Sequence, residues 1–271
     1  MRQLAACLKK DYREFLRGRK NVLCLLVLLC LSTAVLAVTK LFPLLLAQVL
    51  GRAPGFLTDS EAMGERLARF FPADVKGSLG ILASDIGVFY SIVAVWMSFS
   101  LIPAELRAGK WILPVQAGYR AETLLLSKCL IYAAGTAFPV FVIYQVYYMA
   151  ASALLEANLA YTTAVLNALT LSFGIASIVM AAMLLSVLQR GNIWAALTVL
   201  LTVIAAPDVL TFFSFGKWLP TYILTFAYSV DCSVTALVLP VGFTMLLLCW
   251  LFFCAVKKVN MVGEALWRER E

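Results

Sequence analysis

The residues with the most chemistry to offer lie between two long apolar runs, in the stretch Pro103–Arg120. This stretch brings an acid, two bases, a glycine and an indole close together: Glu105, Arg107, Gly109, Lys110 and Trp111. Ionised carboxylates and cations bind polar partners through charge-assisted hydrogen bonds. The set therefore indicates either a binding surface or an ordinary charged turn.

The same stretch has signals for local structure. Pro103 suits the first position of a helix, and Gly109 suits its end. We therefore expect a short helix that carries the acid, followed by Trp111 at a membrane interface. Pro114 and Gly118 then predict a turn before the next apolar run.

Several kinds of reactive site are excluded by residue types. The chain has no histidine, which removes Ser-His-Asp and Cys-His catalysis and the commonest metal ligand. Its seven cysteines include no CxxC pair, so we expect no metal site. No G-x-x-x-x-G-K-[ST] loop is present, so we expect this chain to bind neither ATP nor any other cofactor in that way.

The composition is that of a membrane protein. Of 271 residues, 63% are hydrophobic and only 14% are charged, and the mean hydropathy is +0.92. An ordinary soluble domain carries roughly 25% charged residues. Too little polar surface is left for a soluble globule, and several apolar runs exceed the roughly 18 residues of a membrane span.

We predict an all-α membrane protein with one transmembrane domain, 1–271, and six spans. Each run is long enough to cross a hydrocarbon core of roughly 30 Å. The first run continues well past the possible cleavage site at Ala37, which favours a retained span over a signal peptide. The expected spans are 21–50, 80–102, 123–153, 161–188, 192–206 and 234–256.

The basic residues predict that both termini are cytoplasmic. With that topology, 16 of the 22 Lys and Arg residues lie inside and six lie outside. The opposite topology would reverse this bias, against the positive-inside rule. Only Cys232 then falls in an outer loop, so we expect no disulfide between outer loops.

Three segments outside the spans have their own patterns. Residues 1–20 predict a basic amphipathic helix in the inner interface, with a solvated basic tail as the alternative; its apolar face would hold Leu4, Leu8, Tyr12, Phe15 and Leu16. The outer loop 51–79 has charges at helical spacing and predicts a short helical cap. The apolar, broken segment 207–233 predicts a re-entrant segment, with one further span as the alternative.

This layout resembles the permease subunit of the type-2 ATP-binding-cassette exporters. The general plan covers nearly the whole chain, and the closest local pattern is Glu105, Gly109, Pro114, Arg120 and Lys128. The sequence departs from the family where Lys110 and Trp111 replace a common small hydroxyl residue. It departs again at Ser127, where glycine is usual.

The resemblance implies a mechanism. A separate cytoplasmic ATPase subunit would bind ATP and Mg²⁺, and a second permease chain, identical or similar, would complete the pathway. The helix after the second span would be the coupling helix, with Glu105, Arg107 and Lys110 as polar contacts and Trp111 as an anchor. Membrane lipids are the other expected partner, and no nucleic acid is expected.

The substrate is less closely specified. The third span has an aromatic face that could line a route for a lipid-like, amphipathic peptide or drug-like substrate, or could equally pack in an aromatic belt. Its members are Phe138, Phe141, Tyr144, Gln145 and Tyr148.

Three other functions stay open at this point. A secondary carrier usually has charges near the middle of the bilayer, and none is seen here. An intramembrane enzyme would need a catalytic pair, which Asp85 and Asp208 do not suggest. A non-transporting sensor or immunity protein would share the fold. The cysteine usage and compact plan favour a bacterial inner membrane.

Overall fold

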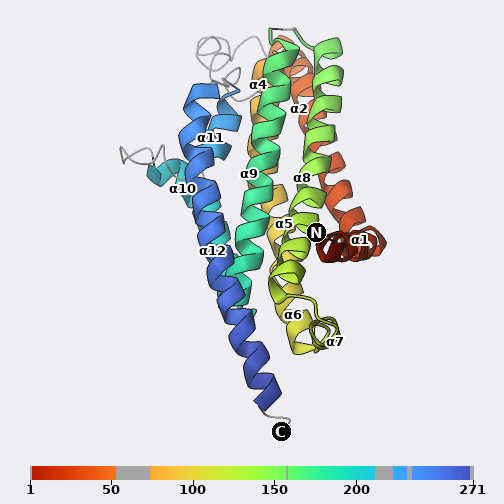
Figure 1. Ribbon diagram of the computed structural model, residues 1–271. Helices are drawn as coiled ribbons and strands as arrows, with labels where there is room; N and C mark the ends of the chain where they lie inside the picture. Colours follow the sequence, from red (N-terminus) through yellow and green to blue (C-terminus); the bar gives the residue numbers. More distant parts are fainter. Residues whose placement is uncertain (1, 53–73, 157, 211–221, 231–233, 269–271) are drawn as a thin grey trace.

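The computed structural model describes residues 2–52, 74–156, 158–210, 222–230 and 234–268. Within these ranges the chain forms helices and one isolated bridge between Asp74 and Glu156, and no strand. Most of the helices run side by side along one axis, and α1 lies across the bundle (Figure 1). Of the predicted segments outside the spans, 53–73 of the outer cap and both 211–221 and 231–233 of the re-entrant segment lie outside the described residues.

Five helices of the described part are long and apolar enough to cross a membrane. They extend over Asn21–Leu41 within α2 (Arg19–Arg52), over Val75–Arg107, over α8 (Ala121–Leu154), over α9 (Tyr161–Leu188), and over Val234–Asn260 within α12 (Val234–Arg268). Prolines do not interrupt α8 or α12, which contain Pro139 and Pro240. The predicted span 192–206 overlaps α10 (Ile193–Leu210). Its apolar part, Ile193–Ile204, is shorter than the five candidate spans and is not counted among them.

The helical run Val75–Arg107 changes its winding partway along. It consists of α4 (Val75–Asp85), a π-helical turn η2 (Ile86–Tyr90), α5 (Ser91–Ser98) and α6 (Leu101–Arg107). The run begins at Val75, before the start predicted for this span at Gly80. The short loop helix α6 begins two residues before Pro103, the residue at which its start was predicted. The loop helix is therefore the end of the span itself, separated from α5 only by a turn.

The connection from α6 to α8 is compact. Gly109 follows α6 with φ +67°, and Gly118 follows α7 (Ile112–Gln116) with φ +85°. Both values lie in the left-handed region that glycine adopts without strain. The predicted turns therefore form, and they fold the chain back beneath α8 (Figure 1).

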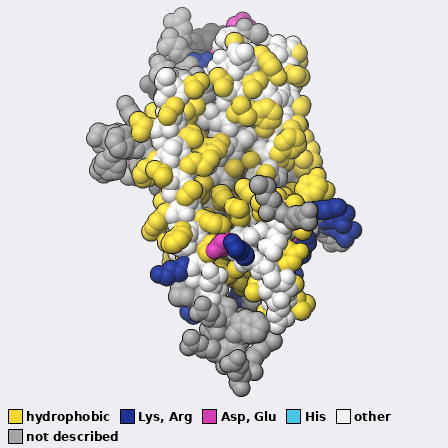
Figure 2. All heavy atoms as spheres, viewed as in Figure 1, with side chains coloured by type: hydrophobic (Ala, Val, Ile, Leu, Met, Phe, Trp, Pro, Cys, Tyr) yellow, Lys and Arg dark blue, Asp and Glu magenta, His cyan; other side chains and the backbone are white. Residues whose placement is uncertain are grey.

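The two ends of the bundle have different elements. We call the end that holds α1 (Arg2–Arg17), α6 and α7 the α7 end, and the opposite end, with α11 (Tyr222–Ser229), the α11 end. α11 lies in the segment predicted to re-enter the membrane, and it packs against α4 and α9. Hydrophobic side chains cover much of the visible surface, whereas Lys and Arg gather toward the α7 end (Figure 2).

The predicted amphipathic helix is present as α1, and one side of it packs against the bundle. It packs on α8. Cys7 and Asp11 are buried, whereas Tyr12 and Leu16 are exposed. The apolar face predicted for the membrane interface is therefore divided between partly buried residues, such as Phe15, and the exposed Tyr12 and Leu16.

Candidate functional site

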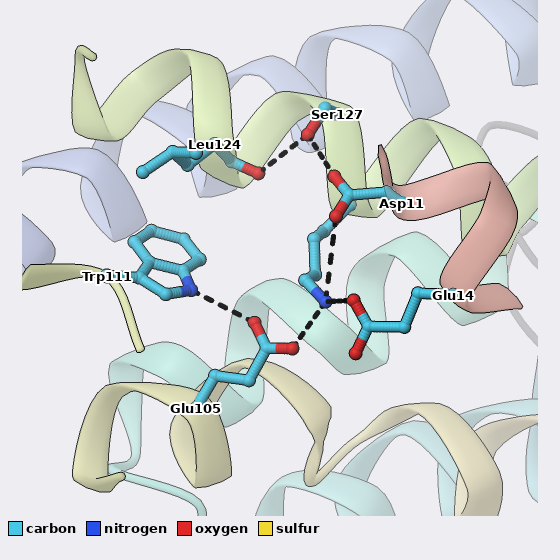
Figure 3. Close-up of polar contacts among 7 residues, drawn as sticks. Asp11, Glu14, Glu105, Trp111, Leu124 and Ser127 are labelled. Atoms are coloured by element: carbon cyan, nitrogen blue, oxygen red, sulfur yellow. Dashed lines mark hydrogen bonds and ion pairs between the residues drawn. The ribbon is translucent and has the colours of Figure 1, made fainter. Parts of the chain in front are cut away.

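The described polar groups converge most closely on Lys128, near the start of α8 (Figure 3). Its side chain is almost fully buried, with 3% of the residue exposed. The Nζ atom hydrogen-bonds to Glu105 Oε1 and lies 3.2 Å from Glu14 Oε2 and 3.8 Å from Asp11 Oδ1. One ammonium thus joins α8 to both α6 and α1, elements that are distant in the sequence.

Glu105 is held from two sides. Its second carboxylate oxygen, Oε2, accepts a hydrogen bond of 3.0 Å from Trp111 Nε1. Both residues are buried. A buried carboxylate needs a counter-ion and hydrogen-bond donors, and Lys128 and Trp111 supply them. This pairing fixes the turn after α6 against the rest of the bundle.

Asp11 connects α1 to the same cluster. Ser127 Oγ lies within hydrogen-bond reach of Asp11 Oδ2 and, at 3.1 Å, of the Leu124 carbonyl oxygen, and its single hydrogen is shared between these two acceptors. Burial raises the pKa of Asp11, while the Ser127 hydroxyl, Lys128 and Lys10 act against this effect and the nearby Glu105 adds to it. Asp11 therefore holds its proton more readily than an exposed aspartate does.

Glu14 responds in the opposite direction. Partial burial alone would raise its pKa, but the attraction and hydrogen bond of Lys128, helped by Lys10 and Lys110, lower the pKa overall. Its carboxylate lies nearer the surface than that of Asp11. Three carboxylates surround one ammonium, so the site has an excess of negative charge. Of these carboxylates, Asp11 is the one that is readily protonated, and Glu14 is the one that stays ionised.

Ring packing supports the charged groups. The Phe15 and Tyr132 rings meet edge to face, with their centroids 5.2 Å apart. Lys128 Nζ lies 5.9 Å from the centroid of Tyr132. A Cβ atom added at Gly135 would come within 2.2 Å of Phe15 Cζ, so only glycine lets the α1 ring approach α8 this closely.

The predicted contact residues divide into two groups. Glu105 and Trp111 point inward and are occupied within the chain, whereas Arg107 and Lys110 are exposed and Gly109 forms the turn. The structure adds an exposed residue that sequence reasoning missed: Leu113 on α7 is 76% exposed. The exposed part of this loop therefore combines two cations with an apolar tip.

The predicted aromatic face of α8 is also divided. Tyr144 is fully buried and accepts a hydrogen bond from Asn167. The Tyr148 hydroxyl donates to the Leu159 carbonyl at 2.9 Å. Phe138 is exposed, Phe141 is partly buried, and Gln145 has an amide that is buried without a hydrogen-bond partner among the described residues. The five residues do not form one continuous surface of the monomer.

The cluster can bind and orient, but it has no reactive arrangement. Among the described residues no group of three or more metal-ligating side chains has the geometry to hold a metal ion. The arrangement is a buried joint between α1, the α6–α7 loop and α8, and it resists separation of these elements because that would leave buried charges unpaired.

Asp11, Glu14 and Trp111 acquired roles that the sequence did not reveal. The signal for the two acids was present: they lie three positions apart in an otherwise basic helix. Lys128 likewise is a single cation near the start of a long apolar run. A lone buried cation demands acidic partners, but choosing among the 15 acidic residues requires the tertiary fold.

Comparison with family models, curated proteins and solved structures gives no match for this chain.

Proposed function

We propose that this chain is the permease subunit of an ATP-driven exporter of the ATP-binding-cassette type. The observation that carries the proposal is the Lys128 cluster, which joins the α6–α7 loop to α1 and α8 while leaving the loop's outer face exposed. A loop fixed in this way suits the transfer of movement from a separate partner to the membrane helices.

The proposed path of this movement follows contacts within the chain. α6 is the end of the run Val75–Arg107, Lys128 lies near the start of α8, and α1 leads directly into α2. A push on the loop would therefore act on three membrane helices together. The turn after α9 supports the loop as well, because a Cβ atom added at Gly191 would lie 2.8 Å from Pro103 Cβ.

The exposed face of the loop supports binding to a cytoplasmic ATPase subunit. Leu113 supplies an apolar anchor, and Arg107 and Lys110 supply positive charge beside it. An apolar residue with a polar rim is the usual composition of a protein interface. The ATPase would bind ATP and Mg²⁺, and this chain would contribute no catalytic residue to hydrolysis.

The proposed topology has six spans with both termini in the cytoplasm. α10 would be the fifth span, and 207–233, which includes α11, would re-enter the membrane from outside. The bias of Lys and Arg toward the α7 end supports this orientation. A second permease chain, identical or similar, would complete the pathway in the cell membrane of a bacterium.

The proposed substrate is lipid-like, an amphipathic peptide or a drug-like molecule. Phe138 and Phe141 of α8 are the best-placed members of the predicted aromatic face, because Tyr144 is buried in a hydrogen-bonded contact. Phe138 is exposed and Phe141 is partly buried beside it, and an exposed aromatic side chain within an apolar surface suits an apolar cargo.

The test is native purification of the chain from its own cell in mild detergent, with mass spectrometry of the proteins that remain bound. We expect an ATPase with a phosphate-binding loop, together with a second permease chain. Repeated recovery of the chain alone, in detergent and in lipid discs, would contradict the proposal and favour a carrier or a sensor.

A matched pair of variants sharpens the test. Leu113→Asp places a charge at the apolar tip and is expected to reduce ATPase recovery by at least about tenfold, because interface anchors contribute about 2 kcal/mol or more. Lys257→Glu changes an exposed residue on α12, outside the loop, and should leave recovery unchanged. Equal recovery with both variants would remove the loop from the interface.

A further inference from the structure

The helix α1 sorts its side chains into three sectors around its axis. One sector packs on α8 and includes the buried Cys7 and Asp11. Beside it lies an apolar strip in which Tyr12 is 53% exposed and Leu16 is 58% exposed. The rest of the circumference is basic and exposed, with Lys9, Lys10, Arg13 and Arg17.

The buried cluster is what makes this outer sector so positive. α1 contains two acids, and both are directed to Lys128: Asp11 from a buried position and Glu14 at 3.2 Å. In Figure 3 both carboxylates turn toward the interior of the cluster. Both acids are thereby paired with Lys128, Asp11 in a buried position and Glu14 nearer the surface, and the bases remain on the exposed face.

The position of α1 places this face beside a membrane. α1 lies across the bundle next to α8 (Figure 1), and it ends at Arg17, directly before α2. The apolar stretch Asn21–Leu41 of α2 is long enough to span a bilayer. Lys and Arg side chains gather at the same edge of the molecule in Figure 2.

We propose that the exposed face of α1 binds anionic phospholipids of the surrounding bilayer. Tyr12 and Leu16 enter the boundary of the acyl chains, and the four basic side chains bind headgroup phosphates. An apolar strip beside a basic sector is the pattern of helices that lie in a membrane surface and prefer anionic lipid. An acidic protein would satisfy the bases but would gain little from an apolar strip at the level where a span begins.

The proposal links lipid composition to the Lys128 cluster. The same helix binds lipid on one side and contributes Asp11 and Glu14 to the cluster on the other. Anionic lipid therefore stabilises the position of α1 from which the α6–α7 loop is held. This inference does not depend on the presence of an ATPase.

The test is native mass spectrometry of the full-length chain with equal amounts of phosphatidylglycerol and phosphatidylcholine. We expect the wild type to retain phosphatidylglycerol preferentially. Lys9, Lys10, Arg13 and Arg17 are then changed to glutamine together. Because one basic residue near an anionic surface strengthens binding by about fivefold, we expect the preference to fall by at least about tenfold.

The control removes the same positive charge from another part of the α7 end. It changes the exposed residues Arg107, Lys110, Arg120 and Arg190 to glutamine, and it should alter the preference by less than about twofold. Equal losses in the two variants, or a preference that survives the α1 changes, would overturn the proposal. An acidic protein that copurifies with the wild type and is lost from the α1 variant, without any lipid preference, would also overturn it.

A second measurement needs no variant and covers the case in which the α1 variant does not fold. Raising the ionic strength from about 0.1 M to 1 M shortens the screening length from about 10 Å to 3 Å. Retention of phosphatidylglycerol by the wild type should fall to that of phosphatidylcholine. Retention that is insensitive to salt would contradict binding through the basic sector.

Discussion

The two ends of the bundle are held together by different chemistry. At the α7 end, charged groups of α1, α6 and α8 meet around the buried Lys128. At the α11 end, neutral groups and small residues form the buried contacts of the described residues. Asn167 donates to Tyr144 Oη and, at 2.9 Å, to the Ala227 carbonyl. Gly80 lets the backbone of α11 approach α4.

The two ends differ in the free energy that is needed to rearrange their contacts. Separating the charged groups at the α7 end would leave buried ions without partners, which is costly. Near the α11 end, the hydroxyls of Tyr228 and Ser172 are already buried without a hydrogen-bond partner among the described residues. The π-helical turn Ile86–Tyr90 is a further irregularity there, of a kind often found at functional sites. We infer a firm joint at the α7 end and an easier rearrangement at the α11 end.

The largest expected effect is that of Lys128→Met. It leaves Glu105 and Asp11 buried without their shared cation, and we expect the free energy of unfolding to fall by about 3–5 kcal/mol. The measurement is denaturant-induced unfolding in lipid discs. Lys110→Met is the control, because Lys110 is exposed in the same loop and should change stability by less than about 0.5 kcal/mol. Similar losses in the two variants would contradict a special role for the cluster.

A smaller effect is expected from Gly80→Ala at the α11 end. The added Cβ atom would lie 2.9 Å from the Tyr228 carbonyl oxygen, so α11 must move. Overpacking of this kind costs about 1–3 kcal/mol. Gly242→Ala is the control, because its Cβ atom would meet no atom within 4 Å. Both changes gain the helix propensity of alanine, so the difference between their unfolding free energies isolates the packing cost; no difference would contradict the close approach of α11.

Asn167→Leu tests the neutral hydrogen bonds. It removes the donor to Tyr144 and to the Ala227 carbonyl. Hydrogen bonds between membrane helices contribute about 0.6–1.7 kcal/mol, so the loss should be smaller than that of Lys128→Met. Thr198→Val is the comparison, because it removes only an exposed bond within α10 and should change little. A loss as large as that of Lys128→Met would remove the distinction between the two ends.

The smallest effect is a pH dependence with opposite signs for two neighbouring acids. The pKa of Asp11 is raised above its ordinary 3.8, so its contribution to stability is greatest below that pH and is lost as pH rises through the raised value. The stability of the wild type relative to Asp11→Asn should therefore decrease as the pH rises from below 3.8 through the raised pKa of Asp11.

Glu14 should behave in the opposite way. Its pKa lies below the ordinary 4.5, so its contribution is present above that pH and is lost as pH falls through the lowered value. The advantage of wild type over Glu14→Gln should increase as pH rises. Melting temperatures of the three proteins between pH 3 and pH 8 provide the test, and slopes of the same sign would contradict the charge arrangement.

The sequence predicts the helices better than it predicts their contacts. Long apolar runs locate α8, α9 and α12, because the period and length of an apolar segment are local properties. Gly109 and Gly118 mark the loop turns correctly, since a left-handed backbone is also a local requirement. The π-helical turn at Ile86–Tyr90 has no comparable signal in the sequence.

The site was predicted only in part because its partners are distant in the sequence. Glu105 and Lys128 were each singled out, but their pairing spans 23 residues, and that of Lys128 with Glu14 spans 114. Trp111 was expected at an interface, and it instead donates to Glu105. The burial of Asp11 beside a cation was not predicted, because hydrophobic periodicity does not identify an ion pair.

The most direct test of the joint is a distance distribution between α1 and the loop. Spin labels are attached through unnatural amino acids at the exposed Ala6 and Ala117, and pulsed electron paramagnetic resonance is recorded in lipid discs. A narrow distribution is predicted for the wild type and for Lys110→Met, and a broad one for Lys128→Met and for Glu105→Gln. Distributions of equal width in all four proteins would contradict the account, because α1 and the loop would then be held together by something other than the Lys128 cluster.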